Sequence, residues 1–233
     1  MKVVVCPFSK PDCTTRLVGN WQRQRATGWQ LVIIENRSGQ FCGGAGPWVV
    51  ATSHTRGAGR ARNLGIQIAL EMGADVVAQW DSDDWYGPDY LLETEEALSR
   101  RALVGKRRHY CDYGSRVVLY EPRWQPGPSD RLMGGTLAFW VDLVRGDPAP
   151  FSDERLDDLV FVEKMKNQAE PWATTVGGYV YNRTRSDHVA PAHTIDLELK
   201  LYGRRGFRLF EPDEGYAAAC REAEHGDILV HPE

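Results

Sequence analysis

Short apolar runs recur along the first 80 residues, and polar residues follow each run directly. Continuous runs of this length are typical of strands buried on both faces of a mostly parallel sheet. The predicted strands are residues 2–6, 29–34, 47–51 and 76–80. Helical spacing of apolar positions predicts helices at residues 16–27 and 57–72, and we interpret the glycine-rich residues 41–46 as a mobile turn. This alternation predicts an α/β fold, with an open, doubly wound, mostly parallel twisted sheet flanked by helices.

The pattern continues less regularly in the second half of the chain. We expect helices at residues 89–101 and 151–166, and β-structure at residues 110–123, 136–141 and 178–181. The residues from 190 onward carry no pattern that indicates a function. Five positive residues follow the first of these helices, and we interpret them as a solvated basic face, with contact to an anionic acceptor as the alternative. They are Arg100, Arg101, Lys106, Arg107 and Arg108.

Three carboxylates lie within four residues directly behind the fourth predicted strand, in Asp81-Ser82-Asp83-Asp84. Carboxylates this close repel one another, and removing them from water without a cation is costly. Oxygen-rich clusters suit Mg²⁺ or Mn²⁺, which keep several waters and take further ligands from substrate phosphates. The same residues are also typical of a solvated acidic turn, with Asp84 or Asp89 as a helix cap. The turn alone does not decide between the two.

Polar and positive residues gather where helix 57–72 begins, at Arg60, Arg62 and Asn63. Backbone N–H groups and the helix dipole at this end favour an anion. Solvated surface arginines would give the same pattern. An open sheet of the predicted kind binds its ligands beyond the carboxyl ends of its strands.

Composition narrows the class of protein. The chain has 233 residues, 42% hydrophobic and 26% charged, which is long enough for one substantial α/β domain and short for two. A formal net charge of -4 gives no general case for nucleic-acid binding. Five scattered cysteines without a CxxC pair argue against a zinc site and a full disulfide framework, which fits a reducing, cytoplasmic setting. The N-terminus indicates a strand rather than a signal sequence, and no apolar run approaches the length of a membrane span, so we expect a soluble protein.

The order of these elements, from about Val3 to His188, resembles the catalytic domain of glycosyltransferase family 2, which has the GT-A fold. Gly59-x-x-Arg62-Asn63-x-Gly65 is similar to the start of a family helix, and Asp81-Ser82-Asp83-Asp84 is similar to the family's DxD motif. The resemblance implies that Asp83 binds the metal on the diphosphate, with Asp81 on the ribose or metal side. It places Arg62 and Asn63 beside the same nucleotide.

The resemblance also indicates where the base of the nucleotide lies. In the family the loop after the first strand borders the base, and here that loop holds Pro7, Phe8 and Ser9. An acid after the second strand contacts the nucleotide, and Glu35 with Asn36 occupies that place. The family more often has Asp-Asp-Gly-Ser there. This departure leaves the identity of the base open.

In the second half, Gly134-Gly135-Thr136 resembles the family's acceptor-side loop and strand. Asp157-Asp158 stands where the family usually has Glu-Asp, which implies that Asp158 is the catalytic base. His188 lies where some members have a third metal ligand or a diphosphate contact. Its local sequence matches poorly, so a surface or core histidine is the alternative.

The resemblance as a whole implies a metal-dependent, inverting glycosyltransferase, hexosyl or related, that uses Mn²⁺ or Mg²⁺ and a nucleoside-diphosphate sugar. We expect a UDP-sugar first. A divalent ion offsets charge on the leaving diphosphate, and a carboxylate that accepts the acceptor's proton makes single displacement sufficient. The acceptor stays open among glycans, proteins, nucleic acids and small molecules.

We expect residues 1–233 to form one domain, with a donor half at about 1–105, an acceptor half at about 106–190 and a tail of unknown role at 191–233. Two other functions are open. A nucleotidyltransferase that makes a nucleotide sugar would normally show a glycine-rich loop after the first strand, which residues 7–11 do not. A non-catalytic nucleotide-sugar-binding module would not need the acids at positions 81, 83 and 158.

Overall fold

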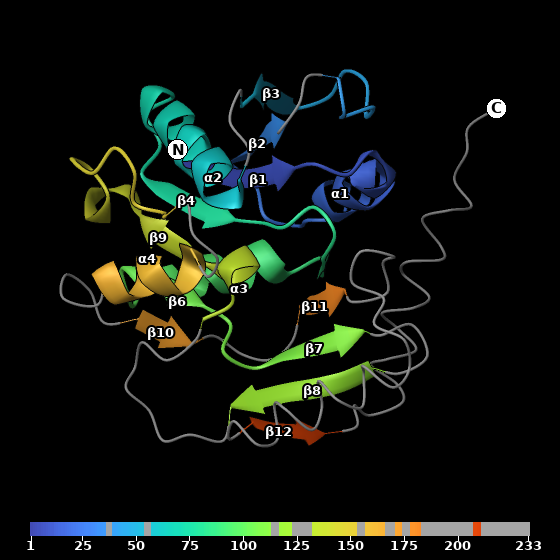
Figure 1. Cartoon of the computed structure of the whole chain (residues 1–233), viewed down its shortest axis with the longest axis vertical. Coiled ribbons are helices and arrows are strands. Elements are labelled where there is room, and N and C mark those ends of the chain that lie inside the picture. Colours follow the sequence, from blue (N-terminus) through green and yellow to red (C-terminus); the bar gives the residue numbers. More distant parts are fainter. Residues whose placement is uncertain are drawn as a thin grey trace.

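The larger of two sheets has seven strands, in the order β10-β6-β9-β4-β1-β2-β3 (Figure 1). The computed structural model describes residues 1–35, 39–53, 57–112, 117–122, 132–152, 157–165, 171–173, 178–182 and 207–210. β1 pairs in parallel with β2 and β4, β2 with β3, and β6 with β10, whereas β9 runs antiparallel between β4 and β6. The strands are β1 Lys2–Phe8, β2 Trp29–Glu35, β3 Trp48–Thr52, β4 Val76–Gln79, β6 Leu103–Gly105, β9 Ala138–Trp140 and β10 Pro171–Ala173. The predicted α/β class with a mostly parallel sheet is confirmed.

The strand order places a topological switch point between β1 and β4. The chain moves from β1 outward through β2 to β3, and then returns to the other side of β1 to form β4. The loops that leave β1 and β4 at their carboxyl ends therefore separate in opposite directions. In open α/β sheets, the crevice between two such loops is where ligands bind.

β1 extends two residues farther than the sequence predicts. We expected Pro7 and Phe8 in a loop, but they pair with Ile34 and Glu35 of β2. Pro7 cannot donate a ladder hydrogen bond, and a central strand would normally exclude it. Pairing of β1 with β4 ends at Val5, so Pro7 lies where only one side of the strand is still paired.

Alternate residues of the strands face two apolar cores, one on each face of the larger sheet. Val3 and Val5 of β1 pack with residues of α2 (Ala58–Glu71) and α4 (Asp157–Met165). The intervening Val4 and Cys6 pack with residues of α1 (Thr14–Gln22) and α3 (Tyr90–Leu98) on the other face. Complete burial of one such side chain stabilises the fold by about 1.5–3 kcal/mol. None of the helices in the described ranges is long and apolar enough to cross a membrane.

Gly65 lets α2 approach the sheet closely. A Cβ atom at this position would lie 2.2 Å from Cγ1 of the fully buried Val5. The glycine in the sequence Arg62-Asn63-x-Gly65 is therefore required for packing of the helix on β1, and this packing fixes the height of Arg62 above the sheet.

The smaller sheet has five strands in the order β12-β8-β7-β11-β5, and β7, β8 and β12 lie below the larger sheet in Figure 1. β7 and β11 pair in parallel, and the other neighbours are antiparallel. β12 belongs to the predicted tail, and it pairs with β8 at the sheet edge. The strands are β5 Trp85–Tyr86, β7 His109–Asp112, β8 Val117–Pro122, β11 Tyr179–Asn182 and β12 Phe207–Phe210. Three short 3₁₀ turns complete the described elements: η1 Pro11–Cys13, η2 Gly134–Thr136 and η3 Val141–Leu143.

The prediction of a solvated basic face is wrong for Lys106. Its side chain is only 2% exposed, and its ammonium lies 3.2 Å from the Glu93 carboxylate of α3 and 5.5 Å from the centre of the Tyr90 ring. Burial lowers the pKa of Lys106, and the neighbouring Glu93 carboxylate acts in the opposite direction. Lys106 is a buried ion-pair partner because α3 covers the strand that precedes it.

Candidate active site

The acidic turn, Asp81–Asp84, joins the two sheets at the switch point. It follows β4 in the larger sheet and leads directly into β5 in the smaller one. The backbone N–H of Asp84 donates to the carbonyl of Asp81 at 3.3 Å and closes the turn. The turn directs its three carboxylates into three different environments.

Asp81 lies against a nearly buried arginine. The Arg62 guanidinium, on a side chain that is 5% exposed, is 2.8 Å from the Asp81 carboxylate, and it stacks over the Phe151 ring at 5.5 Å. Burial raises the pKa of Asp81, Arg62 acts against that rise, and the charges of Asp83 and Asp158 add to it. Arg62 therefore holds Asp81 in place and offsets part of the repulsion among the acids.

Asp83 faces the loop that leaves β1. The Lys10 ammonium lies 3.1 Å from its carboxylate, and the Arg16 guanidinium donates to its backbone carbonyl at 2.8 Å. Two cationic side chains from the β1–α1 region thus meet one residue of the acidic turn. Negative charge at the end of β4 attracts a cation here even without a bound ligand.

Asp84 is fully buried, and its carboxylate has its partner in the smaller sheet. Its carboxylate accepts a hydrogen bond of 2.5 Å from the Tyr179 hydroxyl of β11, and its carbonyl accepts one of 2.8 Å from the Asn20 amide. Burial and the Asp84 charge raise the pKa of Tyr179 well above its usual range, so this hydroxyl remains a donor. Asp84 anchors the turn to the smaller sheet and is no helix cap.

A glycine turn, Gly134–Thr136, brings Asp81 and Asp158 to one place. The N–H of Gly134 donates to the Asp158 carboxylate at 3.1 Å. A Cβ atom at position 134 would lie 2.8 Å from the Cβ of Asp158, and one at position 135 would lie 2.7 Å from Oδ2 of Asp81. Only residues without a side chain allow both acids to approach the turn this closely.

Asp158 owes its position to the apolar face of α4. It lies in the first turn of the helix and is partly buried, whereas Phe161, Val162 and Met165 are almost completely buried in the core. The Phe161 ring stacks on Phe151 at 4.3 Å. Because Arg62 also stacks on Phe151, one aromatic pair supports both the Arg62–Asp81 side and the Asp158 side.

Asn63 helps to hold this support in place. Its side-chain amide donates to the Phe151 carbonyl at 2.9 Å and accepts from the Phe151 N–H at the same distance. The sequence predicts Asn63 beside a nucleotide. In the structure its amide pins the segment at Phe151 to α2.

The predicted base-binding residues gather at the ends of β1 and β2. Phe8 is buried and meets the Phe41 ring edge-on at 5.4 Å, and Ser9 beyond it is exposed. Glu35 is 4% exposed, and its carboxylate accepts from the N–H groups of Phe41 at 2.5 Å and Gly39 at 3.1 Å. The predicted mobile turn is therefore anchored at Phe41. Asn36 and His188 lie outside the described residues.

Two carboxylates of the acidic turn, Asp81 and Asp83, are of the chemical type that a hard divalent cation prefers. Among the residues described, no group of three or more acidic, histidine or cysteine side chains is arranged around a metal position. Mg²⁺ and Mn²⁺ nevertheless require only one or two carboxylates when waters and substrate phosphates supply the other ligands. Burial raises the pKa of Asp81 and the Asp83 charge raises it further, and a bound cation would oppose both effects. Asp83 and Asp81 therefore fit the predicted metal.

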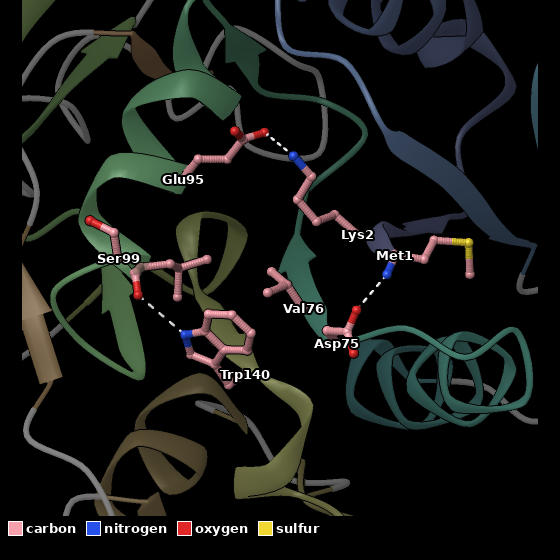
Figure 2. Close-up of a pocket in the computed structure, with 8 residues that line it drawn as sticks. Met1, Lys2, Asp75, Val76, Glu95, Ser99 and Trp140 are labelled. Atoms are coloured by element: carbon pink, nitrogen blue, oxygen red, sulfur yellow. Dashed lines mark hydrogen bonds and ion pairs between the residues drawn. The ribbon is translucent and has the colours of Figure 1, made fainter.

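A separate cavity of about 410 Å³ lies at the opposite end of the strands of the larger sheet, where β1 and β4 begin (Figure 2). Lys2 pairs with Glu95 at 2.5 Å on its wall, and the Met1 amino group pairs with Asp75 at 2.5 Å. Val76 and Trp140 contribute apolar wall between these pairs. This cavity is remote from the switch point and contains none of the predicted site residues.

Sequence reasoning missed Lys10, Tyr86 and Tyr179. Lys10 could have been found from its place in the loop behind the first strand, close to the predicted diphosphate. The two tyrosines carry no signal in the sequence, because their partners Gly135 and Asp84 lie 49 and 95 residues away.

Comparison with known proteins supports the fold. The sequence matches no protein-family model and no curated protein. Among solved structures, the chain is similar to the mannosyltransferase PcManGT from Pyrobaculum calidifontis in complex with GDP-Man and Mn²⁺. The TM-score is 0.59 at 12% identity, over 98% of this chain and 70% of that one. It is also similar to a protein from Desulfovibrio desulfuricans G20 that bears the provisional assignment nucleotide-diphospho-sugar transferase, with a TM-score of 0.49 at 13% identity over 88% and 97%. The first likeness shows a GT-A-like fold.

Proposed function

We propose that the protein is a metal-dependent glycosyltransferase that transfers a sugar from a nucleoside-diphosphate sugar to a hydroxyl acceptor. One observation carries the proposal: the glycine turn brings Asp81, from the acidic turn, and Asp158, from α4, together beyond the strand ends. A single displacement requires one carboxylate on the side of the sugar donor and a separate carboxylate base, and here both lie beside one narrow turn.

The donor would lie in the crevice between the β1 and β4 loops. Asp83 and Asp81 would hold Mn²⁺ or Mg²⁺, which when bound offsets the charge on the leaving diphosphate. Arg62 fixes the direction of Asp81, and Lys10 adds positive charge beside Asp83.

For the nucleotide base, we propose the surface at Pro7 and Ser9, which the buried Phe8 supports through its contact with Phe41. Glu35 supports this surface by holding the backbone of residues 39–41. The predicted contacts of Asn36 with the nucleotide, and of His188 with the metal or diphosphate, remain part of the proposal.

The acceptor hydroxyl would approach from the side of the glycine turn, with Asp158 as the general base. Its oxygen would form the new bond to the anomeric carbon while the bond from that carbon to the diphosphate oxygen breaks. The hydroxyl proton would pass to the Asp158 carboxylate, and nucleoside diphosphate would leave. One displacement of this kind inverts the anomeric carbon. The hydrogen bond from Gly134 N–H orients the carboxylate without adding or removing charge.

The likeness to a mannosyltransferase solved with GDP-Man and Mn²⁺ supports a sugar nucleotide and a divalent ion as ligands. UDP remains our first expectation for the nucleotide, and GDP is the second because of this neighbour. We further propose that residues 1–105 form a donor half and residues 106–190 an acceptor half of one domain. The 191–233 tail contributes β12 to the smaller sheet.

A ligand panel tests the proposal directly. Thermal unfolding would be measured with UDP, GDP, TDP and CMP compounds, each with and without Mn²⁺. A ligand at a hundred times its dissociation constant should stabilise the fold by about 2.7 kcal/mol. Release of nucleoside diphosphate from the matching sugar donor should then follow. If none of the compounds gives Mn²⁺-dependent stabilisation, the proposal is overturned.

A further inference from the structure

The hydroxyl of Tyr86 bridges the acidic turn and the glycine turn. It accepts a hydrogen bond of 2.7 Å from the backbone N–H of Asp81, and it donates one of 2.7 Å to the carbonyl of Gly135. The neighbouring Gly134 N–H donates to Asp158 at 3.1 Å. Three hydrogen bonds, joined through the backbone of Gly134 and Gly135, therefore connect the backbone of Asp81 with the carboxylate of Asp158.

The phenol ring cannot move without disturbing the core. Tyr86 is fully buried and stacks on Trp80 at 4.3 Å with an interplanar angle of 11°. The Tyr90 ring meets it edge-on at 4.9 Å, and the Tyr179 ring lies at 5.3 Å. The backbone N–H of Tyr86 donates to the buried Asn20 side chain at 3.1 Å. The hydroxyl is therefore held at a fixed point between the two turns.

The hydroxyl is also held in the form that can make both bonds. A phenol oxygen accepts and its proton donates, whereas a phenolate could only accept. The Asp81 N–H can only donate and the Gly135 carbonyl can only accept, so the Tyr86 hydroxyl accepts from the first and donates its proton to the second.

We propose that Tyr86 is a positioning residue. Its hydroxyl sets the spacing between Asp81, the acid on the side of the sugar donor, and the base Asp158. This inference rests on the proposed function and extends it to a residue that contacts neither substrate. A misplacement of about 1 Å between reacting groups can reduce the rate by about 10²-fold. Loss of the bridge should therefore affect turnover far more than donor affinity.

Tyr90 provides a matched control. Its hydroxyl donates to the Thr136 carbonyl at 3.3 Å, in the same glycine turn, and within the described part of the chain it makes no hydrogen bond to the acidic turn. Both rings belong to the same aromatic cluster, and both hydroxyls are buried. Tyr86→Phe and Tyr90→Phe each remove one buried oxygen, yet only the first breaks the bridge.

The experiment compares the two variants by amide hydrogen exchange, by binding of nucleoside diphosphate with Mn²⁺, and by release of nucleoside diphosphate from the sugar donor. In Tyr86→Phe, the Asp81 amide should exchange at least about 10-fold faster. Turnover should fall by about 10–10²-fold, with the dissociation constant of the diphosphate unchanged. Tyr90→Phe should match the wild type in all three measurements.

Unchanged Asp81 exchange, unchanged turnover, or equal effects of the two substitutions would overturn the positioning role. If Tyr86→Phe does not fold, a fluorinated tyrosine at this position keeps the ring and the hydroxyl but makes the oxygen a poorer acceptor. Faster Asp81 exchange is then expected and unchanged exchange contradicts the bridge. A wild-type protein that releases no diphosphate from any donor refutes the proposed function, whereas an active wild type with an equally active Tyr86→Phe refutes only the positioning role.

Discussion

The Lys10 ammonium lies 3.1 Å from the Asp83 carboxylate, at the place where a divalent cation is expected. Both side chains are mostly buried, with exposures of 25% and 19%. The β1–α1 loop thus supplies its own cation to the acidic turn. A metal that binds Asp83 must displace this ammonium or share the carboxylate with it.

We therefore predict that Lys10→Met increases the affinity for Mn²⁺ in the absence of nucleotide. Partly exposed ion pairs contribute up to about 1 kcal/mol, so the gain should be about two- to fivefold. Titration calorimetry with Mn²⁺ alone measures it. Arg25→Met is the control, because its partner Asp89 is an exposed acid outside the acidic turn. Weaker or equal binding by Lys10→Met would show that the ammonium does not compete with the metal.

Asp83→Ala should abolish the Mn²⁺-dependent stabilisation by nucleoside diphosphate and leave the fold intact. The physical reason is that this carboxylate is the acid of the turn that faces the β1–α1 loop rather than the core. Thermal unfolding with and without Mn²⁺ provides the measurement, and Asp89→Ala is the control. Undiminished metal-dependent stabilisation in Asp83→Ala would remove Asp83 from the set of ligands.

Gly135→Ala should disturb the site by contact alone. The new Cβ would lie 2.7 Å from Oδ2 of Asp81 and 3.1 Å from the Tyr86 hydroxyl, so one of them must shift. Overpacking typically costs about 1–3 kcal/mol of stability, and here diphosphate binding should weaken as well. Gly105→Ala is the control, because its new Cβ would lie 3.1–3.3 Å from leucine side chains and none of the site residues. It should therefore show the effect of crowding on stability without weaker diphosphate binding. Equal diphosphate affinity in wild type and Gly135→Ala would argue against the close approach of Asp81.

The buried Lys106 predicts a pH-dependent difference in stability. Burial lowers its pKa from 10.5 in the folded protein. Between the lowered value and 10.5 the unfolded chain binds more protons, so this residue's contribution to stability rises with pH. The free energy of unfolding would be measured by urea denaturation for the wild type and for Lys106→Met. The wild-type value minus the variant value should increase from neutral pH toward pH 10.5. A constant difference across this range would mean that the ammonium is not desolvated.

The regular part of the fold could be predicted because it depends on local sequence. Continuous apolar runs mark β1, β2 and β4, and helical spacing marks α2, so these elements could be predicted, although β1 continues to Phe8. Short strands such as β6 and β10 were missed. Each has three residues, and its pairing partner lies more than 30 residues away, which no local pattern can indicate.

The acids of the candidate site could be predicted from the sequence, but the separate environments of their carboxylates could not. The sequence shows Asp81, Asp83 and Asp84 side by side, whereas the structure directs one to Arg62, one to Lys10 and one to Tyr179. The same limit explains Lys106. Its ion pair is with a residue 13 positions earlier, on a helix that folds back over it. Partners chosen by tertiary packing decide whether a charge is solvated, buried or available to a ligand.

Asp158→Asn tests the general base most sharply. Asparagine keeps the shape of the side chain and an oxygen that can accept the Gly134 N–H, so the glycine turn and α4 should remain in place. It removes the basicity needed to take the hydroxyl proton. Affinity for diphosphate with Mn²⁺ should hold, while transfer to a verified acceptor should fall by about 10²–10⁴-fold. Near-normal transfer would place the base elsewhere, with Asp157 as the next candidate. Loss of donor binding together with transfer would show that Asp158 supports the site rather than acting on the acceptor.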